Sequence, residues 1–143
     1  MSEEVIKLEF IIHGKLPSLN EYQAACRANK YQGAKFKKEV EEFIGWEIRS
    51  ALCRGAIIPT KKPIRLEFKW HERTKKRDAD NIASAKKFIL DAMQKQGVIP
   101  NDSRRYVKGF SDDIVDDTSD FVSVKIIVLQ TEDNEGESGK KTG

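Results

Sequence analysis

The stretch Ile64-Arg65-Leu66-Glu67-Phe68-Lys69-Trp70 decides how the middle of the chain folds. Its apolar side chains stand at every second position and alternate with charged ones, which is typical of a β-strand with one buried face. The residues that follow are charged, and they lead into a segment whose apolar positions repeat with helical spacing up to Met93. The pattern therefore predicts a strand, a charged loop and a helix in succession.

The predicted helix begins around Asp80-Asn81, where Asp80 is well placed as the N-cap, and it ends at Gly97, a helix-terminating residue. Its apolar face is made by Ile82, Ala85, Ile89 and Met93. At about 100° per residue, the opposite face falls in line with Asp80. That polar face carries Ser84, Lys87 and Asp91.

Three further strands and one further helix are predicted on either side of this segment. Alternating apolar residues indicate strands at residues 6–12, 104–110 and 122–128. Helical spacing indicates a helix over residues 36–52, before Gly55, and Pro17-Ser18-Leu19-Asn20 is predicted to be a loop. The order β-α-β-α-β-β predicts an α+β domain with a mixed four-stranded sheet covered by two helices.

The length of the chain favours a single domain. A chain of 143 residues can bury one core, which we place in residues 1–130, with Trp46 and Trp70 among the core residues. Residues 131–143 carry no large apolar side chain. They are predicted to form a disordered polar tail.

Neither a membrane segment nor a disulfide is expected. No stretch approaches the roughly 18 consecutive apolar residues of a membrane span, and the N-terminus lacks the pattern of a signal peptide. We therefore expect a cytosolic (cytoplasmic) protein with two reduced thiols, Cys26 and Cys53. These cysteines and the two histidines, His13 and His71, could bind zinc by ligand type alone, but the usual short spacings are absent.

The net charge of +3 says little about a partner, but the distribution of the basic residues says more. Residues 13–38 are basic and partly aromatic, with Glu21 as their one acid, and a second basic cluster spans residues 69–77 around Glu72. Basic clusters of this kind bind the phosphates of nucleic acid. The residues expected to contact DNA are Lys15, Asn20, Arg27, Lys30, Lys35, Arg73, Lys75, Lys76, Arg77 and Asn81.

Asp78 and Asp80 follow the predicted strand and stand two residues apart. In extended backbone their carboxylates point to the same side, with Cα atoms roughly 7 Å apart, a spacing that can hold one hard cation. Asp102, in a loop after the helix, could bring a third carboxylate to the same place. Such oxygen ligands suit Mg²⁺, and a metal site with a lysine nearby, such as Lys87, suits hydrolysis of a phosphodiester.

Simpler interpretations of these residues stay open. An Asp-x-Asp sequence before a helix is most often an N-cap with a favourable charge at the positive end of the helix dipole. Lys87 and Asp91 have the spacing of an ordinary i,i+4 ion pair, and residues 75–77 could be a solvated loop. The acidic pairs at 112–113 and 116–117 are expected in a solvated turn before the last strand.

Three motifs carry a resemblance to a known family. They are Lys76-Arg77-Asp78-Ala79-Asp80-Asn81, Lys86-Lys87-Phe88-Ile89-Leu90-Asp91-Ala92-Met93 and Gly97-Val98-Ile99-Pro100-Asn101-Asp102. Together they resemble the core of the RusA family of Holliday junction resolvases, in the longer branch common in Gram-positive phages. The resemblance implies a homodimeric, Mg²⁺-dependent endodeoxyribonuclease that resolves four-way DNA junctions by paired symmetric nicks, in DNA recombination and repair.

The resemblance also implies roles for single residues. Asp78, Asp80 and Asp102 match the three metal-binding aspartates of the family, for which Mg²⁺ is the ion and Mn²⁺ a substitute. Glu72 resembles a position typical of the longer branch and is a candidate fourth carboxylate. The catalytic lysine has no unique match, because counting forward from Asp80 reaches Ser84, whereas counting back from the later aspartate of the helix reaches Lys87. Lys87 carries the charge and is the candidate.

Two other functions stay open beside a junction-resolving nuclease. The first is a nuclease of the same chemistry that acts on flaps or replication forks. The second is a non-catalytic DNA-binding module whose aspartates only cap a helix.

Overall fold

A computed structural model of the protein describes residues 6–129, so the tail predicted at 131–143 lies outside the described residues. The elements follow one another as β1 (Ile6–His13), α1 (Leu19–Ala28), α2 (Lys30–Arg54), β2 (Ile64–Glu72), α3 (Ala79–Ala83), α4 (Lys86–Lys95), β3 (Val107–Asp116) and β4 (Phe121–Val128). The predicted α+β class and the order of helical and extended segments are confirmed. No helix in the described part of the chain is long and apolar enough to cross a membrane.

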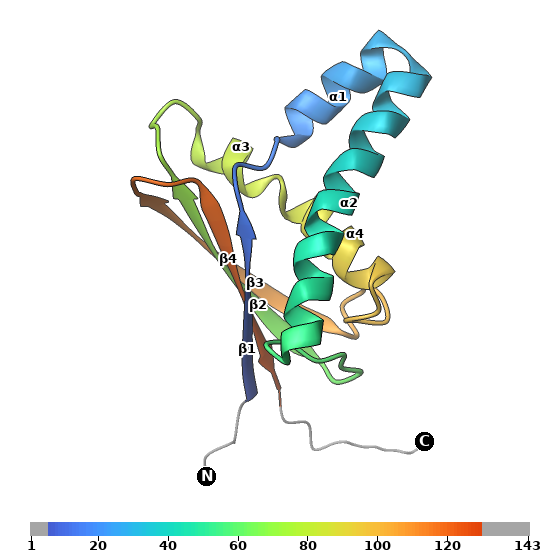
Figure 1. The fold of residues 1–143 in the computed structure, drawn as a ribbon, viewed down its shortest axis with the longest axis vertical. Helices are drawn as coiled ribbons and strands as arrows, with labels where there is room; N and C mark the ends of the chain where they lie inside the picture. The colour runs from blue at the N-terminus through green and yellow to red at the C-terminus, as the bar shows by residue number, and fades with distance from the viewer. Residues whose placement is uncertain (1–5, 130–143) are drawn as a thin grey trace.

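The four strands form one mixed sheet in the order β1-β4-β2-β3. β4 pairs antiparallel with both β1 and β2, whereas β2 and β3 are parallel neighbours. A parallel pair needs a long connection that returns the chain to the starting end of the sheet, and the segment holding α3 and α4 supplies it. α2 and α4 lie on the same face of the sheet (Figure 1).

The core lies between that face and helices α2 and α4. The apolar positions of the stretch 64–70 are all buried, which confirms the predicted alternation in β2. Helix α2 adds Ile44, Ile48 and Ala51 to the core, and helix α4 adds Phe88, Ile89, Ala92 and Met93. Trp70 is buried as expected, but Trp46 on α2 is 67% exposed, so its prediction as a core residue is wrong.

The first helical segment is a hairpin of two helices, where a loop and one helix were predicted. The predicted loop ends at Ser18, which caps α1 in a capping box: its side chain accepts from the Glu21 N–H, and the Glu21 side chain accepts from the Ser18 N–H. The Ser-x-x-Glu signature is visible in the sequence. Helix α1 has no apolar stripe from which it could be predicted, because none of its residues is buried.

The second predicted helix is divided into α3 and α4 at Ser84 and Ala85. The Ser84 hydroxyl donates to the Asn81 carbonyl at 2.6 Å and accepts from the Leu19 N–H at 3.0 Å, and this second bond ties it to another part of the chain. The N-cap is Asp78, so the prediction of Asp80 as the cap is wrong by two residues. The apolar face of the helix is buried as predicted.

The third strand is longer and later than predicted, at Val107–Asp116. It therefore includes Asp112, Asp113 and Asp116, which were expected in a turn. The pattern misled because β3 is an edge strand, on which only Val107 is buried and acidic side chains can face water.

Candidate metal and nucleic-acid site

Asp78 is the last residue of the loop between β2 and α3, and Asp80 lies in the first turn of α3. Both residues are exposed. Asp78 occupies the N-cap position, yet its side chain makes no capping hydrogen bond. Asp80 Oδ1 accepts only from the N–H of the next residue, Asn81, at 3.0 Å. Within the residues that the structure describes, neither carboxylate lies within ion-pair distance of a basic side chain. Both acids are thus exposed, and the bond from the Asn81 N–H to Asp80 is the one side-chain hydrogen bond that they make within the described residues.

Two contacts place the start of α1 next to these aspartates. The Asn20 side-chain amide donates to Asn81 Oδ1 at 2.8 Å, and the Leu19 N–H donates to the Ser84 hydroxyl at 3.0 Å. Asn20 and Asn81 were both predicted to contact DNA, and the structure brings their side chains together. The base of the α1–α2 hairpin is therefore part of the surface around Asp78 and Asp80.

Glu72 at the end of β2 is paired with Arg77. Arg77 Nη2 lies 2.7 Å from Glu72 Oε2 and its Nε lies 3.3 Å from Oε1, so the guanidinium binds both oxygens. Arg77 also donates through Nη1 to the Leu16 carbonyl at 3.0 Å. The two side chains are only 6% and 16% exposed. This arrangement gives no support to Glu72 as a fourth metal ligand or to Arg77 as a DNA contact, because each is occupied by the other.

Lys87 and Asp102, which were predicted to share one site, do come together. Lys87 Nζ lies 3.9 Å from Asp102 Oδ2 and 3.4 Å from Asp91 Oδ1. The acid Asp91 also faces Lys37 of α2, at 3.7 Å. Lys37 in turn lies 2.9 Å from Glu41, and this interaction raises the pKa of Lys37 although burial opposes the charge. A chain of alternating charges therefore runs from α2 across α4 to the Asp102 loop.

Four members of this chain of charges, Lys37, Glu41, Lys87 and Asp91, line a cavity of about 790 Å³ between α1, α2 and α4. Tyr22 and Phe88 add apolar surface to its lining. The Lys87 side chain is 56% exposed at this place.

Its neighbour Lys86 points the other way. Lys86 Nζ lies 2.6 Å from Asp112 Oδ2 and 4.7 Å from the centre of the Phe110 ring, both on β3. Asp112 also accepts from the Trp70 indole N–H at 2.9 Å. Lys86 therefore joins α4 to the sheet, whereas Lys87, whose side chain is 56% exposed, is the more accessible of the two lysines.

Asp78 and Asp80 have the oxygen donors that the predicted metal site requires, but the structure does not bring a third predicted ligand to them. Exposed carboxylates such as those of Asp78 and Asp80 are the oxygen ligands that Mg²⁺ prefers, with waters filling its other positions. Across residues 6–129, no group of three or more His, Cys, Asp or Glu residues is close enough to hold a metal ion. Asp102 instead meets Lys87. Both cysteines are free, as predicted.

The two histidines have partners other than a metal. His13 Nδ1 lies 2.8 Å from Glu47, and His71 Nδ1 lies 2.8 Å from Asp117. The Thr118 N–H and His71 together hold the pKa of Asp117 below its usual range. These two pairs were not foreseen, because nothing in the spacing of the sequence links residues 34 or 46 positions apart.

The predicted DNA contacts fall on two surfaces. Arg27, Lys30 and Lys35 are exposed on the α1–α2 hairpin, and Lys15 is exposed just before it. In the loop after β2, Lys76 is exposed, while Arg73 lies 3.9 Å from Asp120 and Lys75 lies 3.7 Å from Asp116. These last two are exposed ion pairs of the kind that contributes little to stability, so they leave the lysine and arginine free to exchange partners.

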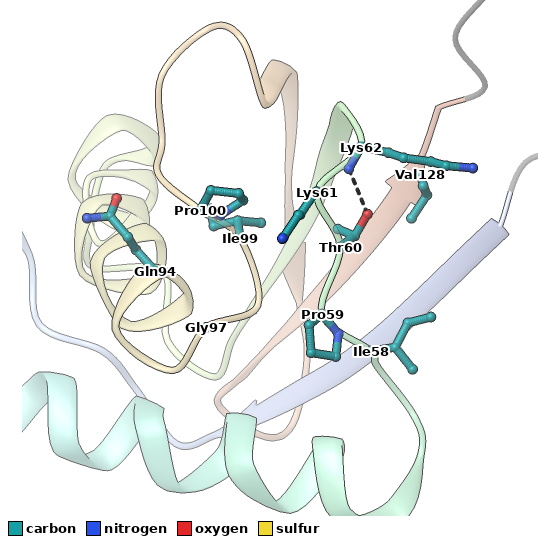
Figure 2. A pocket seen from close by; sticks show the side chains of 10 residues that line it. All are labelled: Ile58, Pro59, Thr60, Lys61, Lys62, Gln94, Gly97, Ile99, Pro100 and Val128. Carbon is teal, nitrogen blue, oxygen red and sulfur yellow. Dashed lines mark hydrogen bonds between the residues drawn. The ribbon is translucent and has the colours of Figure 1, made fainter. Parts of the chain in front are cut away.

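A second cavity, of about 800 Å³, lies at the other end of the sheet (Figure 2). It is bounded by the loop before β2, with Pro59, Thr60 and Lys61, and by Ile99 and Pro100 after α4. β2 is about 25 Å long from this end to Glu72, so the cavity is remote from Asp78 and Asp80. Its lining is mostly apolar, and it holds none of the predicted site residues.

No protein-family model matches this chain, and no curated protein matches it. The resemblance to the RusA family therefore stands on the three sequence motifs quoted above.

Proposed function

We propose that the protein is a Mg²⁺-dependent endodeoxyribonuclease of the RusA type that nicks four-way DNA junctions in recombination and repair. The observation that carries the proposal is the state of Asp78 and Asp80. They stand at a helix start, yet Asp78 makes no capping bond, and both face solvent. The helix-cap interpretation would give at least the first of them a structural task, and the structure offers none.

The candidate residues have the chemistry needed to handle a phosphodiester. Asp78 and Asp80 would hold Mg²⁺, which would neutralise charge that builds on the phosphorus oxygens. Lys87, beside Asp102, would add a positive charge near the phosphate. The exposed basic residues of the hairpin and of the loop after β2 would bind the flanking backbone.

One observation favours the non-catalytic alternative. Asp102 lies beside Lys87, and within the described residues no third carboxylate joins Asp78 and Asp80. A DNA-binding module needs the basic surfaces but not the metal site. Binding of branched DNA without cleavage under any metal condition would therefore identify a module.

A cleavage experiment separates these functions. Four-way junction, flap and linear duplex of matched sequence are incubated with the protein in Mg²⁺, in Mn²⁺ and with chelator. We expect paired nicks in the junction alone, with either metal and not with chelator. Cleavage of flaps in preference to junctions would favour the flap nuclease, and cleavage of linear duplex at the same rate would reject structure selectivity altogether.

A further inference from the structure

The α1–α2 hairpin projects from the body of the protein. In Figure 1 both helices, drawn in blue and cyan, extend beyond the end of the sheet. No residue of α1 is buried, and in α2 the only buried residue before Glu41 is Gly33. The outer part of the hairpin, which is α1 and the first turns of α2, therefore adds little to the core, so its protrusion needs another explanation.

The hairpin is built as a stiff arm. Helices α1 and α2 are joined by the single residue Asn29, whose side chain accepts from the Gln32 N–H at 2.8 Å and caps α2. The helices touch closely at Gly33, where a Cβ would lie 2.6 Å from Cys26 Sγ and 3.0 Å from Cys26 Cα. Near its base the Tyr22 ring packs on Phe36 and, edge-on, on the buried Phe88 of α4, with ring centres 5.9 and 5.8 Å apart.

The base of the arm is joined to the candidate site. Three contacts that reach across the chain meet there: Leu19 with Ser84, Asn20 with Asn81, and Leu16 with Arg77. A stiff arm anchored in this way holds its tip at a set position relative to Asp78 and Asp80.

The tip combines positive charge with an exposed aromatic ring. Residues 22–38 contain five basic residues and no acid. Tyr31, in the first turn of α2, is 70% exposed, more than any other large apolar or aromatic side chain of the described chain. Arg27 and Lys30 flank the turn beside it and are exposed. A planar ring between cations is the combination that binds bases and phosphates together.

We propose that this arm grips branched DNA, with Arg27 and Lys30 on the phosphates and Tyr31 stacked on the face of a base that is unstacked at the open branch point. This inference rests on the proposed function. It identifies the part of the protein that gives the selectivity for branched DNA. Inside a duplex each base is covered on both faces by its neighbours, whereas at the open centre of a junction a base pair can lose the neighbour on one face and present that face to an aromatic ring. The positive charge of the arm attracts the phosphates of duplex and junction equally. We therefore attribute the selectivity to the Tyr31 ring.

The test measures binding in chelator, where no cleavage occurs. A four-way junction carries 2-aminopurine at the branch point or, as a second probe, well inside one arm. Tyr31→Ala is compared with Tyr31→Phe, which keeps the ring, and with Trp46→Ala. Trp46 is a matched control, because it is exposed to a similar degree on the same helix, about 22 Å away along the helix axis.

We expect the wild-type protein to change the fluorescence of the branch-point probe only. Tyr31→Ala should abolish that change and weaken junction binding about fivefold or more, with duplex binding unaltered. Tyr31→Phe and Trp46→Ala should behave as wild type. Circular dichroism confirms that each variant is folded.

Two failures can be told apart. If the wild-type protein binds junction and duplex equally, the proposed function itself is wrong. If it prefers the junction and Tyr31→Ala keeps both the preference and the fluorescence change, the proposed function stands and the arm is not the source of selectivity. Equal loss of duplex and junction binding in Tyr31→Ala would also overturn the stacking proposal.

Discussion

Asp78 and Asp80 are two exposed acids whose side chains have almost no partner within the described protein. Both carboxylates are exposed, so they are open to a cation or a substrate from solvent. Substitution of either aspartate therefore tests the metal-binding role directly.

Asp80→Asn should abolish cleavage while DNA binding is kept or strengthened, since the change removes one metal-binding charge and reduces repulsion of phosphate. The amide oxygen of asparagine can still accept from the Asn81 N–H, so the fold should persist. Nicking of a labelled junction and fluorescence anisotropy measure the two effects. Asp113→Asn, at an exposed carboxylate of β3, is the control. Cleavage at the wild-type rate by folded Asp80→Asn would restore the interpretation of Asp80 as a purely structural residue.

The Glu72–Arg77 pair is a residue-scale feature of another kind. Its members are largely buried, and they bind each other bidentately. A buried ion pair need not add stability over an apolar pair of similar size, but losing one partner strands a charge away from water. The pair also holds the loop before Asp78 against Leu16.

Arg77→Met should therefore lower the free energy of unfolding by about 3–5 kcal/mol, because Glu72 is left buried without its partner. The double variant Glu72→Leu, Arg77→Met should recover most of that loss. Urea denaturation measures both. If Glu72 is instead a metal ligand, Glu72→Gln would abolish the Mg²⁺-dependent cleavage with little loss of stability.

At the scale of elements, α4 sends two successive lysines in different directions. Lys86 is fixed over Phe110 and against Asp112, and Lys87 faces Asp91 and Asp102. Residues one apart on a helix are separated by about 100°, so one can serve packing while the next serves a surface. The same short helix thus joins the sheet to the candidate site.

Lys87→Ala should reduce the cleavage rate at saturating DNA at least tenfold, about 1.4 kcal/mol in the barrier, with little change in binding. Lys86→Ala should leave that rate unchanged and lower stability by about 1 kcal/mol, because it loses the ring contact and the ion pair with Asp112. Single-turnover nicking and thermal unfolding measure the two. Normal cleavage by both variants would show that the charge comes from another residue, such as Lys75 or Lys76.

At the scale of the whole molecule, positive charge is concentrated on the hairpin and on the loop after β2, while β3 is acidic. A net charge of +3 is too small to hold DNA without this separation. The loop after β2 leads directly to the aspartates, and the base of the hairpin is bonded to Asn81 and Ser84, which follow them in the chain.

DNA binding should weaken steeply with salt, because each phosphate contact releases counterions and adds about 0.9 to the logarithmic slope. Replacing Arg27, Lys30 and Lys35 together by alanine should reduce the slope by up to about 3. Replacing Lys61 and Lys62, at the far end of the sheet, should leave it unchanged. A slope that does not respond to the hairpin variant would reject the hairpin as a DNA-binding surface.

Paired symmetric nicks are most simply made by two identical sites related by a two-fold axis, so we expect a homodimer. Light scattering at micromolar concentration should give twice the chain mass of 16.3 kDa. A monomer that still nicks both strands symmetrically would contradict this expectation.

The sequence by itself determined the elements whose pattern repeats locally. β2 and β4 follow from alternation, and the buried faces of α2 and α4 follow from helical spacing, because one covered face imprints its period on the chain. α1 and the full length of β3 could not be predicted in this way. α1 buries no residue and β3 lies at the edge of the sheet, so neither has an apolar period to detect. The same reasoning identified the Asp78–Asp80 segment as a place where chemistry could occur.

Only the tertiary structure decided which of the predicted site residues meet. It put Glu72 against Arg77, Asp102 against Lys87, and Asn20 against Asn81, and it divided the second helix where Ser84 bonds to Leu19. The contacts at Asn20 and Leu19 join residues more than sixty positions apart, and such contacts leave no local period in the sequence. They form because the sheet order β1-β4-β2-β3 and the packing of α1 on α4 bring the segments together, and close packing then selects the partners.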